Sequence, residues 1–263
     1  MIFLKTEEEI ELMRESCLLV SKTLAMLAPL IQPGVSTAYL DKIAEEFIRD
    51  NGAIPACKGY CGYPNATCMS INDMVVHGIP HKDIVLQEGD ILSVDLDTLK
   101  NGFCGDSAYT FAVGEVSPEV RRLLDITKKS LFLGIEQAVA GNRIGDIAST
   151  IQTYCENAGY SVVRDMIGHG LGRDLHEDPE VPNYGRKGQG KMLTPGMVIC
   201  IEPMINMGKY DMYIENDGWT ARTKDHKISA HYEHCVAIRK GKADILSDFR
   251  IIEKALETKI IEN

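Results

Sequence analysis

Long hydrophobic runs are missing from this 263-residue sequence: none approaches the roughly 18 residues that a membrane span requires. A secretory signal is missing too, because four glutamates occupy the first 14 residues, where a signal peptide needs a basic and then an apolar stretch. Basic residues are outnumbered 28 to 38, and the net charge of −10 argues against a nucleic-acid or anionic-membrane surface. These absences predict a cytoplasmic protein without DNA or membrane partners.

Paired cysteine motifs are also absent. The eight cysteines contain no C-x-x-C pair, which makes a zinc ribbon improbable. Without an export signal, most of them should be free thiols. We interpret Cys17, Cys155, Cys200 and Cys235 as small, buried hydrophobic residues.

Apolar stripes predict two pairs of helices. A capping box at Thr6 and Glu9 starts the first helix, whose stripe continues to Leu27, and a second helix is expected from about residue 36 to 51. A later pair begins at Ser117-Pro118 and stops at Gly159. Both pairs have the length and spacing of helices in a globular domain.

The later pair repeats the first at an offset of 107 residues. The same offset lays the segment EGDILSVD (88–95) on PGMVICIE (195–202), and so Asp95 on Glu202. A period this long is not that of a solenoid. It predicts one domain, residues 1–263, made of two related halves of roughly 1–112 and 113–263.

A hairpin is predicted around Asn101-Gly102, which separates strands at 91–99 and 103–112. A two-residue turn would place Asp97 opposite Asp106, with Asp95 on the same face. Residues 197–205 and 229–238 are predicted to be two further strands, which carry Glu202 and Glu233.

These acids lie beside apolar strand residues, and a buried carboxylate needs a counter-charge. Basic residues are mostly elsewhere in the sequence, so a metal ion is the simplest source of that charge. Three histidines are each found near glycine or acidic residues: His77 before Gly78, His169 between two glycines, and His176 before Glu177. Such histidines could hold a metal or contact a substrate, although a single histidine is more often a core residue.

Five segments together carry a specific resemblance: SINDMVVHGIP, VDLDTLKNGFCGDSAYTF, GHGLGRDLHEDP, GMVICIEPM and SAHYEHCVAI. In combination they resemble the methionine aminopeptidases of the short bacterial type I form, over nearly the whole chain. The resemblance implies an α+β chain with the pita-bread fold, a single catalytic domain in which pseudo-twofold halves surround a curved, mainly antiparallel sheet.

The resemblance also implies a dinuclear metal centre. Its five ligands would be Asp95, Asp106, His169, Glu202 and Glu233, with Asp106 and Glu233 bridging two divalent ions. One nitrogen among oxygen ligands favours Mn²⁺ or Fe²⁺ over Zn²⁺, and Co²⁺ should also support activity. His77, His176 and Glu202 are the implied catalytic residues, with Glu202 as the proton carrier.

A pocket for the methionine side chain is implied beside the metals. Its residues would be Cys57, Tyr60, Tyr63, Cys68, Leu175 and Trp219, with His77 and His176 contacting the peptide. Cysteine and aromatic groups suit a thioether, although plain core packing is an equal alternative for Cys57 and Cys68. Three residues depart from the usual pattern: Cys61, where histidine is common, Leu175, where phenylalanine is common, and Asp97, where threonine is common.

The implied activity is removal of N-terminal methionine from peptides and nascent proteins whose second residue is small. A prolidase-like or X-Pro aminopeptidase and a non-catalytic peptide-binding protein of the same fold are the alternatives. The chain lacks the extra N-terminal domain that is usual in prolidases, and it keeps all five ligands that a non-catalytic relative would tend to lose. We further expect a monomer that associates transiently with ribosomes.

Overall fold

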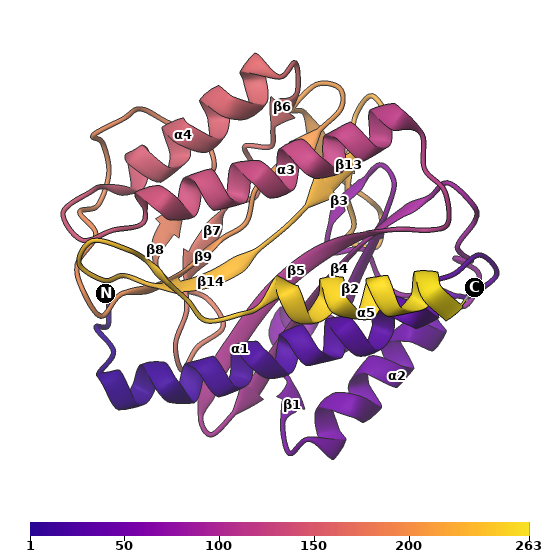
Figure 1. The fold of residues 1–263 in the computed structure, drawn as a ribbon, viewed down its shortest axis with the longest axis horizontal. Helices are drawn as coiled ribbons and strands as arrows, with labels where there is room; N and C mark the ends of the chain where they lie inside the picture. The colour runs from indigo at the N-terminus through magenta and orange to yellow at the C-terminus, as the bar shows by residue number, and fades with distance from the viewer. Residues whose placement is uncertain (263) are drawn as a thin grey trace.

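A computed structural model describes residues 1–262 of the chain. Its longer helices are α1 (Glu7–Leu27), α2 (Thr37–Asp50), α3 (Pro118–Gln137), α4 (Ile144–Asn157) and α5 (Phe249–Glu262), and short 3₁₀ turns cover Ala28–Leu30 and Tyr60–Gly62. Figure 1 shows α3 and α4 on one side of the strands and α1, α2 and α5 on the other. In this view the strands run between the two groups of helices and behind them.

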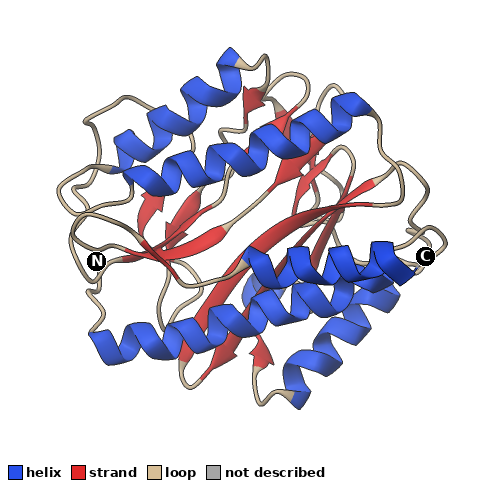
Figure 2. Cartoon of the chain, in the orientation of Figure 1, coloured by secondary structure: helices blue, strands red, loops and turns tan. Residues whose placement is uncertain are grey.

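The strands within the described residues form four small sheets, drawn in red in Figure 2. One sheet holds β1 (Ile54–Pro55), β2 (Cys68–Ile71), β4 (Ile91–Lys100) and β5 (Phe103–Ala112); a second holds β6 (Ser161–Val162), β10 (Met204–Asn206) and β13 (Ser229–His231). A third holds β3 (Met74–Val76), β11 (Met212–Ile214) and β12 (Ala221–Thr223); the last holds β7 (Gly168–Gly170), β8 (Glu177–Val181), β9 (Val198–Ile201), β14 (His234–Ala237) and β15 (Asp244–Ile245). The pairings between these strands are antiparallel, as the α+β prediction requires.

The predicted offset of 107 residues recurs in the elements themselves. Helix α2 covers Thr37–Asp50 and α4 covers Ile144–Asn157, so both ends differ by 107. Strands β4 and β9 likewise start at Ile91 and Val198. The glycines before them, Gly89 and Gly196, both have a φ of 89°, a left-handed conformation that favours glycine. The offset is confirmed for these elements, while the division of the chain near residue 112 stays a prediction.

The hairpin of β4 and β5 has the predicted register. Asn101 and Gly102 both have positive φ, 53° and 78°, as a two-residue turn of this twist demands. Asp97 pairs directly with Asp106 across the ladder. Helix α1 covers the hairpin closely at Gly105, where a Cβ would lie 2.3 Å from the backbone nitrogen of Cys17.

The two later strands differ from their prediction, because each is broken into two. Residues 197–205 form β9 and β10, and residues 229–238 form β13 and β14. At the break, β9 pairs with β14 in one sheet, whereas β10 pairs with β13 in another. Pro203 lies at the first break and has no N–H to donate to a continuous ladder. Glu202 and Glu233 therefore lie at the two junctions rather than within strands.

Most of the apolar side chains pack into one large core between the helices and the strands. All eight cysteines lie in the described range and are free, and the four predicted to be buried, Cys17, Cys155, Cys200 and Cys235, have no exposed surface. Among residues 1–262, no helix combines the length and the apolar character needed to cross a bilayer.

Candidate active site

A cavity of about 310 Å³ opens where the hairpin β4–β5 approaches the strand junctions at Glu202 and Glu233. Its walls include every site residue predicted from the sequence: Cys57, Tyr60, Tyr63, Cys68, His77, Asp95, Asp106, His169, Leu175, His176, Glu202, Trp219 and Glu233. These residues come from segments that are up to 176 positions apart in the chain, from Cys57 to Glu233. The fold therefore brings together all the predicted candidates at one site.

The hairpin supplies acidic groups to the floor of this cavity. One carboxylate oxygen each from Asp95, Asp97 and Asp106 lie within 4.8 Å of one another. Asp97 and Asp106 are 8% and 4% exposed, so solvent screens their charges poorly. The alternation of β4 places its apolar residues Leu92, Val94 and Leu96 in the core, each fully buried.

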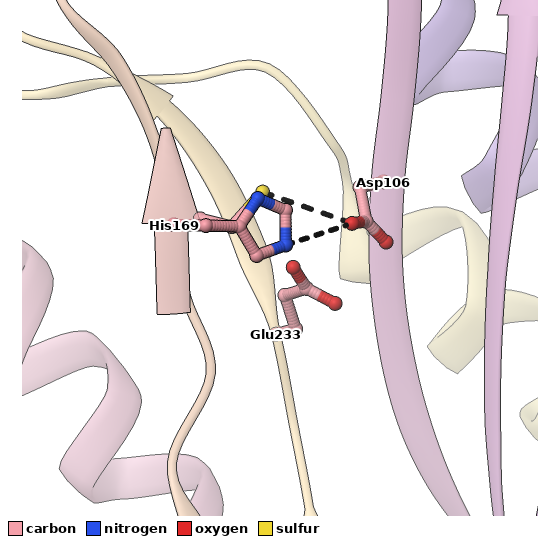
Figure 3. Close-up of side chains that lie close together, drawn as sticks. Asp106, His169 and Glu233 are labelled. Carbon is pink, nitrogen blue, oxygen red and sulfur yellow. Dashed lines mark hydrogen bonds and ion pairs between the residues drawn. The ribbon is translucent and has the colours of Figure 1, made fainter. Parts of the chain in front are cut away.

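His169 reaches the same place from β7. Gly168 and Gly170 flank it because the chain there is crowded: a Cβ on Gly168 would lie 2.3 Å from the Cys200 carbonyl oxygen. The His169 Nδ1–H donates to the Gly170 carbonyl at 2.9 Å. The other ring nitrogen, Nε2, lies 3.5 Å from Asp106 Oδ2 and 3.6 Å from Glu202 Oε1. Figure 3 shows His169 from β7, Asp106 from β5 and Glu233 from the junction before β14 converging on one point.

Glu233 is fixed by the hairpin that carries Asp106. The Glu233 backbone N–H donates to the Ala108 carbonyl at 2.9 Å, and the Ser107 hydroxyl donates to the Glu233 carbonyl at 2.7 Å. At the other junction, the Asn183 side-chain amide donates to the Glu202 carbonyl at 3.0 Å. Both glutamate backbones are thus tied to their neighbours, which limits the movement of their carboxylates.

Burial raises the pKa of Asp95, Asp106 and Glu202, and the charges of neighbouring carboxylates raise it further. Burial, followed by the charge of Asp97, raises the pKa of Glu233 to about 8. Burial lowers the pKa of His169 to about 3, so its ring is neutral at pH 7. The protein's own groups therefore supply too little positive charge to keep these acids ionised.

The hydrogen bonding of His169 tests whether a cation fits. A carbonyl only accepts, so the neutral ring carries its proton on Nδ1, and the Nε2 lone pair faces two carboxylate oxygens. An acceptor that faces acceptors is repulsive unless a cation or a proton lies between them. Within residues 1–262, Asp106 Oδ1 and Glu233 Oε1 are also buried without a hydrogen-bond partner. The residues present therefore fit a divalent metal ion.

Cys200 lies behind this cluster. Its thiol donates to Asp106 Oδ2 at 3.9 Å, and its sulfur is 3.0 Å from that of Cys235. One ligand atom of Cys200 is also within 4.8 Å of those of Asp106, His169 and Glu233. Burial raises the pKa of the Cys200 thiol well above its usual value, which keeps the proton that it donates to Asp106.

The opposite wall of the cavity is apolar. Cys57, Tyr63 and Cys68 form a small cluster of their own, against which Trp219 packs, with its ring edge-on to Tyr63 at 5.2 Å. The buried Asp41 carboxylate holds this segment in place, because it accepts from the backbone N–H groups of residues 66 and 67 at 3.1 and 2.9 Å. The wall is therefore preorganised by a network outside the cavity.

Two histidines stand at the edges of the cavity. His77 has a φ of 57°, a strained conformation for a residue other than glycine, and burial lowers its pKa to about 4. The His176 ring lies 4.2 Å from that of His169 and 5.1 Å from that of Tyr60. The turn that carries His176 is anchored by Glu177, which accepts from the Arg173 N–H at 3.0 Å and pairs with the buried Lys5 at 2.5 Å.

Comparison with known proteins identifies this combination of fold and site. Residues 11–240 match the model of metallopeptidase family M24. The chain belongs to metallopeptidase family M24. It is 51% identical to the methionine aminopeptidase of Clostridium acetobutylicum, over 94% of this chain and 99% of that protein. The Bacillus subtilis methionine aminopeptidase 1 is 47% identical over the same shares of the two chains.

Solved M24 structures confirm the fold. The methionine aminopeptidase of Rickettsia prowazekii superposes with a TM-score of 0.93 and 40% identity, covering 94% of this chain and all of that one. A prolidase from Pyrococcus furiosus superposes with a TM-score of 0.73 and 25% identity, but only 65% of that chain is covered. The predicted pita-bread fold is thus correct, and the ligand cluster and the M24 family together support the use of a divalent metal.

Sequence reasoning missed several residues of this M24 site. Asp165, Met166 and Ile167 line the cavity just before the glycines around His169. His231 is almost completely buried, and its Nε2 lies 3.7 Å from Glu202 Oε2. His231 stands two residues before Glu233 in the segment SAHYE. This strand-like spacing was the only sequence signal that pointed to His231.

Proposed function

We propose that this chain removes N-terminal methionine from peptides and newly made proteins whose second residue is small, by metal-dependent hydrolysis. One observation carries the proposal: the neutral His169 directs its Nε2 lone pair at carboxylate oxygens of Asp106 and Glu202. A divalent cation would stabilise that arrangement, which lies in the same cavity as an apolar wall. The family membership and the similar methionine aminopeptidases point to the same reaction.

The metal would be held by Asp95, Asp106, His169, Glu202 and Glu233, with Asp106 and Glu233 shared between two ions. Divalent ions bound there would polarise the scissile carbonyl and lower the pKa of a water molecule. Oxygen-rich ligands with one imidazole favour Mn²⁺ or Fe²⁺; Co²⁺ would serve in vitro, and Zn²⁺ is a weaker candidate.

Glu202 would move the proton in this reaction. Its carboxylate lies between His169 and His231, at 3.6 and 3.7 Å, with its backbone carbonyl fixed by Asn183. A carboxylate whose pKa is raised by burial is suited to taking a proton from water and giving it to the leaving amine. His77 and His176, on the edges of the cavity, would donate hydrogen bonds to the peptide and orient its carbonyl.

The methionine side chain would occupy the apolar wall. Cys57, Cys68, Tyr63 and Trp219 offer polarisable sulfur and aromatic contacts to a thioether. Tyr60 and Leu175 would close the pocket on the side of His176. Because the amine of the substrate would be bound at the metal beside Asp95, only the first residue could be released.

The cellular setting is part of the same proposal. Free thiols at all eight cysteines suit a reducing compartment, and the substrates would be chains emerging from ribosomes in the cytoplasm. We propose a monomer that meets the ribosome transiently.

Hydrolysis of a Met-Gly-peptide and of an X-Pro-peptide, each with Mn²⁺ and after exhaustive chelation, tests this proposal. We expect Mn²⁺-dependent release of methionine from the first peptide only. Cleavage of the X-Pro peptide instead would identify a prolidase-like enzyme, and no cleavage of either peptide by protein that has bound Mn²⁺ would favour a non-catalytic binding protein.

A further inference from the structure

Asp97 is a carboxylate of the cavity that the five-ligand set leaves unexplained. In the ladder of β4 and β5, it pairs directly with Asp106, and Asp95 precedes it by two residues on the same face. Carboxylate oxygens of these three residues lie within 4.8 Å of one another, and Asp97 is only 8% exposed. The hairpin therefore presents three acids to one point of the cavity.

Three carboxylates so close together repel one another, and burial strengthens the repulsion because water screens them poorly. No lysine or arginine within the described chain forms an ion pair with any of them; Asp106 Oδ2 faces the neutral His169 ring at 3.5 Å, and the Asp106 carboxyl hydrogen-bonds with that of Asp97. Asp106 Oδ1 is in addition buried without a hydrogen-bond partner. A positive charge brought by a ligand is the simplest way to stabilise this arrangement.

We propose that Asp97 is a further carboxylate of the metal centre, so that the hairpin contributes three acids, not two, to the cation it holds. In this proposal Asp97 coordinates the cation itself, beside Asp95 and Asp106. An extra buried carboxylate favours hard divalent ions such as Mn²⁺ and raises the affinity of the hairpin side of the site. The inference deepens the proposed metal-dependent function and rests on it for the presence of the cation.

Calorimetric titration of the chelated protein with Mn²⁺ alone tests this role without measuring catalysis. Asp97→Asn keeps the shape of the side chain and removes its charge. We expect the dissociation constant of at least one Mn²⁺ equivalent to rise tenfold or more. The matched control is Asp174→Asn, which removes the same charge from an exposed residue outside the cavity wall and should leave both constants within twofold of the parent values.

Asp97→Glu provides a second measurement if Asp97→Asn does not fold. It keeps the charge and moves the carboxylate by one methylene group, so the visible absorption spectrum of bound Co²⁺ should change from that of the parent. Mn²⁺ constants in Asp97→Asn equal to those of the parent would overturn the inference, as would an unchanged Co²⁺ spectrum in Asp97→Glu. Unchanged Mn²⁺ binding with a raised KM would also overturn it, because Asp97 would then serve the substrate's ammonium group.

Failure of this inference is distinguishable from failure of the proposed function. A parent protein that binds Mn²⁺ but releases no methionine would contradict the function, while the effect of Asp97→Asn on the Mn²⁺ constants could still be measured.

Discussion

Asp106 is the side chain on which the contacts of the site converge. Its Oδ2 faces His169 Nε2 at 3.5 Å and receives the Cys200 thiol at 3.9 Å, while its Oδ1 has no hydrogen-bond partner within residues 1–262. In the proposed function Asp106 would hold a metal ion, whereas His176, which is exposed, would contact the substrate. Replacing the two side chains should therefore have different effects on metal binding and catalysis.

Replacing each of these residues separates the two roles. Asp106→Asn should lose a metal equivalent and reduce kcat/KM by at least about 100-fold, or about 2.7 kcal/mol of transition-state stabilisation. His176→Ala should retain the metal and mainly lower kcat, by about tenfold. Elemental analysis together with steady-state kinetics checks both, and full metal content in Asp106→Asn would contradict its role as a bridging ligand.

His234 predicts a pH dependence of stability. Its ring is almost completely buried, lies 3.7 Å from the Phe249 ring and has Nδ1 2.6 Å from the Ser247 hydroxyl; burial lowers its pKa to about 3. Histidine in the unfolded chain has a pKa of about 6.5. The unfolded state thus binds more protons between pH 3 and 6.5, so the stability is complete above pH 6.5 and falls as the pH drops.

From pH 7 to pH 5, His234 should therefore cost the parent protein up to about 2 kcal/mol of unfolding free energy. His234→Gln cannot take up this proton and should show a correspondingly smaller pH dependence. Urea unfolding of both proteins after chelation, at the two pH values, measures this difference. The other titrating groups are the same in the two proteins, so their contributions cancel. Identical pH dependence in the two proteins would contradict the pKa of the buried ring.

At the scale of elements, local signals were enough for some segments and not for others. The register of β4 and β5 was predictable because Asn101-Gly102 fixes a two-residue turn, and every pair then follows from it. The breaks in 197–205 and 229–238 were not, because they arise where a strand changes partners between two sheets. That exchange depends on tertiary packing, which apolar alternation along the chain does not encode.

The close packing of α1 against β5 is also set by whole elements. A Cβ at Gly105 would lie 2.3 and 2.4 Å from backbone atoms of Cys17 and Ser16, which cannot rotate away. At Gly134 in α3, the added Cβ would instead meet the end of the flexible Ile151 side chain at 2.7 Å.

Gly105→Ala should therefore destabilise the protein by about 3 kcal/mol through overpacking. Gly134→Ala should change stability by less than about 1 kcal/mol, because the helix propensity of alanine offsets the repacking of Ile151. Chemical denaturation followed by circular dichroism compares the two variants. Equal losses would mean that α1 can move away from the hairpin, contrary to the close packing described here.

At the scale of the whole molecule, the site is lined by segments from before and after residue 112, such as Asp95 and Asp106 on one side and His169 and Glu233 on the other. Long motifs located the acids and histidines of the cavity, and four of the five motifs combine such residues with glycines, as around His169. His231 and residues 165–167 escaped because their types and spacing are ordinary; only the folded chain brings His231 to Glu202. The preference for a small second residue in the proposed substrates likewise depends on the shape of the assembled cavity.

The most direct measurement is the release of methionine from a peptide library that varies only at the second residue, followed by mass spectrometry with Mn²⁺ and after chelation. With the amine held at the metal and the side chain against Trp219 and Tyr63, a bulky second residue should meet His77 and the segment from Cys57 to Tyr63. Losing about 3 kcal/mol of transition-state binding lowers kcat/KM more than 100-fold. We predict Mn²⁺-dependent cleavage of Met-Ala and Met-Gly peptides and survival of Met-Leu and Met-Lys peptides; comparable kcat/KM for Met-Ala and Met-Leu, or full release after chelation, would contradict the account.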